Sequence, residues 1–132
     1  MRKHTPGPWG IERLHGEINV ISCNERDGAA KDMGIVYVLA RDVGGMIHGE
    51  QFDDRSEVEA NARLMAAAPD LLAELKKTVD NEQQAVFEDW LLRTRPSGCF
   101  ELVQSQFHES SDFADFRESW KSQIAAIAKA TA

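Results

Sequence analysis

The sequence predicts an α+β fold in which a small antiparallel β-meander of about three strands precedes three to four α-helices. Residues 1–52 alternate apolar and polar side chains between turn signals, whereas residues 53–132 repeat apolar side chains at helical spacing. Strand and helix signals segregated in this way are typical of α+β proteins. The length of 132 residues, 42% of them hydrophobic, fits a single domain. We expect a β region at 1–52, a helical core at 53–80 and a helical extension at 81–132.

The expected strands lie between residues 8 and 41. In the first strand, Trp9, Ile11 and Arg13 alternate with residues of the opposite face. A tight turn is expected at His15-Gly16, because glycine adopts positive φ without a steric penalty. Residues 17–22 form the expected returning strand. The run at 34–40 is apolar on both faces, which predicts a strand in the centre of the sheet.

Four helices are expected after residue 53. The first, at 56–68, begins with a capping-box pattern, and its Ala-rich faces predict that it is well buried against the sheet. Pro69 is expected to end this helix, because proline disfavours α geometry at the preceding residue and is tolerated in the first turn of the next helix. Further helices are expected at 70–80, 82–94 and 111–128, the last capped by Ser110 or Ser111.

The charge and cysteine content restrict the class of function. The net charge is −7, and residues 53–132 carry fifteen acidic against nine basic side chains. A field of this sign repels phosphate backbones and suits a basic protein surface, so direct nucleic-acid binding is not expected. No apolar run approaches the ~20 residues of a membrane span, and the basic N-terminus lacks the apolar region of a secretory signal. With Cys23 and Cys99 read as free thiols, we expect a cytoplasmic protein without membrane association.

Residue patterns typical of catalysis or metal binding do not occur. The four histidines, at positions 4, 15, 48 and 108, are scattered and belong to no Cys/His cluster. The glycines match no phosphate-binding loop, and the serines lack a nucleophile elbow. We therefore expect neither a metal nor a cofactor, and a protein that is not an enzyme.

Two sets of residues are candidates for binding. Glu109, Asp112, Asp115 and Glu118 are spaced by three in the expected last helix, where they would form an acidic stripe beside Phe113. The stripe could face a basic partner, or it could be an ordinary solvated helix face. The alternative set, for a small ligand, is Asn61 and Arg63 in the Ala-rich helix, with Trp9 behind Pro6-Gly7-Pro8. Each also has a structural interpretation. Asn61 and Arg63 could bond to nearby backbone or to Glu59, and Trp9 could be an anchor in the core.

Two further segments carry a family resemblance. His4-Thr5-Pro6-Gly7-Pro8-Trp9 and, after a β region, Glu59-Ala60-Asn61-Ala62-Arg63-Leu64-Met65-Ala66-Ala67-Ala68-Pro69-Asp70-Leu71-Leu72 resemble a family of small phage and prophage proteins. The resemblance covers residues 4–11 and 57–76, with weaker support at 34–40, and residues 81–132 are expected to be an extension added to the family core. It implies a phage-encoded protein that acts inside a bacterium. It supplies no reaction and no catalytic residue.

The leading functional hypothesis is a non-enzymatic phage protein that inhibits a host defence complex, as anti-CRISPR proteins do, through its acidic surface. One alternative is a protein that captures a nucleotide signal, with Arg2, Lys3, Arg41, Arg63, Arg93 and Arg95 as the available phosphate ligands. The other is a self-assembling phage accessory protein that forms a homodimer through the aromatic face of its last helix.

Overall fold

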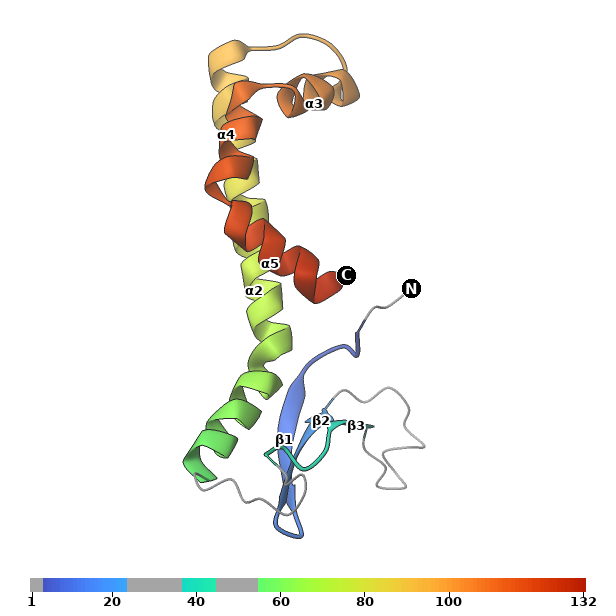
Figure 1. The fold of residues 1–132 in the computed structure, drawn as a ribbon. Helices are drawn as coiled ribbons and strands as arrows, with labels where there is room; N and C mark the ends of the chain where they lie inside the picture. The colour runs from blue at the N-terminus through green and yellow to red at the C-terminus, as the bar shows by residue number, and fades with distance from the viewer. Residues whose placement is uncertain (1–3, 24–36, 45–54) are drawn as a thin grey trace. The chain divides into compact units, whose positions relative to one another are not determined.

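The computed structural model describes residues 4–23, 37–44 and 55–132. Within these residues, in chain order, lie three strands, which form one antiparallel sheet, and four helices, so the α+β prediction is confirmed (Figure 1). The backbone contacts separate two compact units, Met1–Leu71 and Leu72–Ala132. The boundary between them falls inside the longest helix, α2 (Arg55–Thr94).

The sheet of the first unit has the order β1-β2-β3, with β1 at Trp9–Leu14, β2 at Glu17–Ser22 and β3 at Tyr37–Ala40. The expected two-residue turn joins β1 to β2, and its residues His15 and Gly16 both have positive φ, 53° and 80°. The central strand is β2, so the prediction of a central strand at 34–40 was wrong. Its described part, β3, pairs with β2, and Val38 in it is 48% exposed, because an apolar run can also fill an edge strand. Residues 34–36 lie outside the described part.

One face of the sheet packs against the first turns of α2. The register places Ile11 opposite Val20 and Arg13 opposite Ile18 on this face. The arginine donates to the Glu59 carboxylate of α2 through Nε at 3.1 Å and through a terminal nitrogen at 2.5 Å. The apolar core of the unit lies beside this ion pair and consists of Ile18, Val58 and Ala62, with Ile11 and Val43 packed against it.

Beyond that core, α2 is more exposed in the first unit than the sequence predicts. Leu64 is 63% and Leu71 is 56% exposed, whereas Val58 and Ala62 are 7% and 0% exposed. The expectation of a helix buried on several faces was therefore wrong. The apolar core of the unit meets the helix at Val58 and Ala62, whereas Leu64 and Leu71 lie on faces that stay exposed.

Pro69 lies inside α2, so the predicted helix ends at residues 68 and 80 were also wrong. A proline in a helix loses one backbone hydrogen bond because it has no N–H. Here the proline ring packs against Gly7, and a Cβ added to that glycine would lie only 2.7 Å from the Cβ of Pro69. The contact places Gly7 directly against the helix at the proline.

The second unit contains α2 from Leu72 onward, α3 (Phe100–His108), α4 (Ser111–Ser119) and α5 (Lys121–Thr131). Ser110 caps α4, as expected, because its side chain accepts a hydrogen bond from the Phe113 N–H at 3.2 Å. The single helix predicted at 111–128 is instead two helices that meet at Trp120, whose φ of −107° and ψ of 19° depart from helical values. The helical periodicity continues across this residue, so the pattern conceals the break.

The core of the second unit is aromatic. Trp90, Val103 and Phe107 form the buried cluster. Phe107, which is 2% exposed, lies with its ring centroid 4.9 Å from that of Phe87 and 5.4 Å from that of Trp90. Side chains of α3 thus pack against side chains of α2. Of the helices described, none combines the length and the apolar character that crossing a bilayer requires.

Candidate functional site

The predicted acidic stripe is divided between two elements of the second unit. Asp112, Asp115 and Glu118 lie in α4, but Glu109 is the C-cap of α3 and precedes the residue that caps α4. The expectation that the four residues share one helix was therefore wrong for Glu109. The cause is the turn at Ser110, whose backbone N–H donates to the Phe107 carbonyl at 2.9 Å and closes the preceding helix.

Within α4, Asp112 is occupied by an ion pair with Arg93 of α2. The same guanidinium contacts the Asp89 carboxylate, one helical turn earlier on α2, at 2.8 Å. Hydrogen bonds to Asp89 first, and then to Asp112, raise the pKa of Arg93 above its ordinary value. Asp112 therefore ties α4 to α2 and contributes little free charge to the surface.

Asp115 and Glu118, called here the acidic pair, are the exposed members of the stripe that lie in α4, while Glu109 is exposed at the end of α3. Both are exposed and lie three residues apart on α4, a spacing that brings side chains onto neighbouring positions of a helix surface. In the part of the chain that the structure describes, neither has an ion-pair partner. The pair is thus two uncompensated negative charges on a helix that Ser110 caps and Asp112 anchors.

Phe113, which the sequence places beside the stripe, belongs to the aromatic packing of the unit. Its ring centroid lies 5.3 Å from that of Phe107 and 4.7 Å from the imidazole of His108. The Arg117 guanidinium carbon lies 5.8 Å from the same ring centroid. Phe113 is half-buried, and Phe116 in the same helix is 5% exposed, so these aromatic side chains of α4 pack largely within their own unit.

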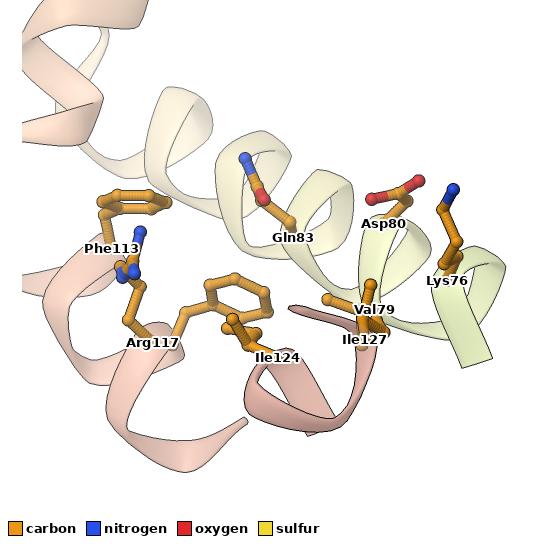
Figure 2. A pocket seen from close by; sticks show the side chains of 9 residues that line it. Lys76, Val79, Asp80, Gln83, Phe113, Arg117, Ile124 and Ile127 are labelled. Carbon is orange, nitrogen blue, oxygen red and sulfur yellow. The ribbon is translucent and has the colours of Figure 1, made fainter. Parts of the chain in front are cut away.

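A groove of about 240 Å³ lies between α2 on one side and α4 and α5 on the other (Figure 2). We call it the α2–α5 groove. Its apolar lining comes from Val79, Phe113, Phe116, Ile124 and Ile127, and its polar lining from Lys76, Asp80, Gln83 and Arg117. Sequence reasoning missed this site, because it arises where residues 76–83 meet residues 113–127. The only local signal is the helical spacing of the apolar residues, which predicts a buried face without saying what faces it.

The alternative ligand-binding set lies in the first unit. Asn61 and Arg63 are exposed on α2, so the expectation that they are polar groups inside a buried helix was wrong. Arg63 lies 3.7 Å from the Glu59 carboxylate, which fits the predicted structural reading. Trp9 is half-buried in β1, and its indole N–H donates to the Thr5 carbonyl at 3.2 Å.

The proposed phosphate ligands are largely engaged with carboxylates. Arg41 contacts Glu17 at 3.3 Å, while Arg63 and Arg93 have the partners described above. Arg95 is exposed at the end of α2, and Arg2 and Lys3 lie outside the described residues. Where the structure describes the chain, no three His, Cys, Asp or Glu side chains gather as potential metal ligands, and both cysteines are exposed free thiols.

No curated protein and no solved structure matches the chain. A family model described as Salmonella phage P22 protein Y8K6 matches residues 1–132. The match runs over the whole chain, residues 81–132 included. The chain therefore belongs to the Salmonella phage P22 protein Y8K6 family.

Proposed function

We propose that this phage protein is a non-enzymatic binding protein that inhibits a host defence complex by docking the acidic pair of α4 on a basic protein surface. The observation that carries the proposal is the exposure of Asp115 and Glu118 without an ion-pair partner in the described chain. Membership of a phage protein family supports a site of action inside the infected bacterium.

The surroundings of the acidic pair favour recognition of a protein. Ser110 and Asp112 hold the first turn of α4, so the two carboxylates are presented on a backbone that is already ordered. An ordered surface loses less conformational freedom on binding than a loop does. The net charge of −7 adds a long-range attraction for a basic surface, which speeds the encounter.

The experiment is affinity capture from the bacterial host with the tagged full-length protein. The test variant is Asp115→Lys with Glu118→Lys. The matched control is Glu74→Lys with Glu82→Lys, because these two carboxylates are exposed on α2 of the same unit and the change in net charge is the same. We expect the test variant to lose a captured host protein that both the wild type and the control retain.

Two results would contradict the proposal. The same host proteins could be captured by all three forms, in which case the acidic pair is a solvated surface. Both variants could lose the protein equally, in which case overall charge and not this position determines capture. Circular dichroism of each variant confirms that the helices are intact before the comparison is made.

A further inference from the structure

We propose that the α2–α5 groove binds a small apolar monocarboxylate, with the carboxylate on Arg117 and the hydrocarbon body along the apolar floor. This ligand site is separate from the acidic pair and does not depend on the proposed inhibitory function. The shape of the groove, the chemistry of its lining and the distribution of charge along it favour such a ligand.

The floor of the groove suits a hydrocarbon chain. Val79 and Phe116 are buried to 6% and 5% exposure, so the base is made of well-packed side chains. Ile124 and Ile127 of α5 are half-buried and form the opposite wall with their aliphatic surfaces. The volume of about 240 Å³ is below the range of drug-sized sites, which favours a ligand of about ten non-hydrogen atoms.

Charge is distributed unevenly along the groove. Lys76 and Asp80 lie at one end, four positions apart on α2, so the formal charges at this end sum to zero (Figure 2). Arg117 lies at the other end beside Phe113. In the part of the chain that the structure describes, Arg117 has no ion-pair partner, unlike Arg93.

Arg117 is well suited to hold a carboxylate. A guanidinium presents a planar set of donors that matches a carboxylate with two parallel hydrogen bonds. The guanidinium carbon lies 5.8 Å from the centroid of the Phe113 ring, which places the charge next to apolar surface. The groove therefore combines one anion-binding end with an apolar body and a neutral far end, which is the charge pattern of an apolar monocarboxylate.

The test uses octanoate as the probe and octan-1-ol as its uncharged match, each titrated into the full-length protein by isothermal titration calorimetry and by NMR. We expect octanoate to bind more tightly than the alcohol and to perturb the resonances of Ile124 and Ile127. In Arg117→Gln the octanoate affinity should fall about tenfold, while the affinity for octan-1-ol is kept. Arg95→Gln is the matched control, because Arg95 is an exposed arginine of the same unit that does not line the groove.

Several results would overturn the proposal. Octanoate that does not bind at millimolar concentration, or that binds Arg117→Gln as tightly as the wild type, would remove Arg117 as the carboxylate site. Resonance changes confined to other residues would place the ligand elsewhere. A concentration-dependent dimer with Ile124 and Ile127 at its interface would show that a second copy of the chain fills the groove.

Discussion

Truncation of Phe107 to alanine gives the sharpest stability prediction for the helical unit. Phe107 is 2% exposed and its ring contacts Phe87, Trp90 and Phe113 with centroid separations of 4.9, 5.4 and 5.3 Å. Replacing a buried phenylalanine by alanine costs about 3–5 kcal/mol through lost burial and the cavity that remains. The aromatic contacts place the cost for Phe107 toward the upper end of this range, since each such pair adds about 0.5–1.5 kcal/mol beyond its buried area.

This loss is large compared with the stability available to the unit. Globular proteins are stable by about 0.05–0.15 kcal/mol per residue, which amounts to about 3–9 kcal/mol for a unit the length of Leu72–Ala132. We therefore expect Phe107→Ala to remove about half or more of the free energy of unfolding of the helical unit at 25 °C. The measurement is urea denaturation of the full-length protein, followed by circular dichroism at the helical band.

Phe100→Ala is the matched control, because it makes the same substitution in the same helix at a side chain that is 66% exposed. We expect its free energy of unfolding to stay within about 0.5 kcal/mol of the wild type. If Phe107→Ala is destabilised by no more than about 1 kcal/mol relative to this control, the aromatic cluster is not the core of the unit and the reasoning fails.

Two further substitutions test local features, each read by urea denaturation. Gly44→Ala should destabilise the protein by about 1–3 kcal/mol, because the added Cβ would lie 2.5 Å from a Val58 methyl carbon at a φ of 76°. Gly16→Ala is the control, because Gly16 has a similar φ of 80° but open space around it. Its loss of unfolding free energy should be smaller by at least about 1 kcal/mol. Equal losses in the two variants would refute the contact with Val58. Ser110→Ala should cost about 1 kcal/mol because α4 loses its N-cap hydrogen bond. Ser111→Ala, at an exposed first helical position, should leave the free energy of unfolding nearly unchanged. A larger loss for Ser111→Ala than for Ser110→Ala would show that Ser111 is the N-cap.

The features that the sequence predicts correctly have local causes. The β1–β2 hairpin follows from the alternation in each strand and from His15-Gly16, where both residues adopt the positive φ that the turn requires. The start of α4 follows from Ser110, whose side chain satisfies a backbone donor three residues later. In both cases the residues that determine the structure are neighbours in the chain.

The features that the sequence misses depend on residues far apart. Pro69 remains inside α2 while its ring packs on Gly7, and no local rule for proline contains that contact. Asp112 reads as one member of an acidic stripe until Arg93, nineteen positions earlier, is found beside it. The groove likewise forms because α5 lies beside α2, and the periodicity of either helix alone does not predict that neighbour.

The proposed contact therefore uses fewer carboxylates than the stripe that the sequence predicts. Four carboxylates at regular spacing would resemble a general negative surface, which any basic protein could approach. Two carboxylates beside an anchored aspartate define a position on the helix that a substitution can address separately from the net charge. This separation is what makes the proposed partner contact testable.

The most direct test of that contact uses the host protein identified by affinity capture, after purification. Its affinity is measured for three forms of the chain at low and high salt. The forms are the wild type, Asp115→Lys with Glu118→Lys, and Glu74→Lys with Glu82→Lys. We predict that the first double variant binds about tenfold or more weakly at low salt, that the second stays close to the wild type, and that high salt narrows the difference. Equal affinity of all three forms, or equal weakening of both variants, would contradict the account.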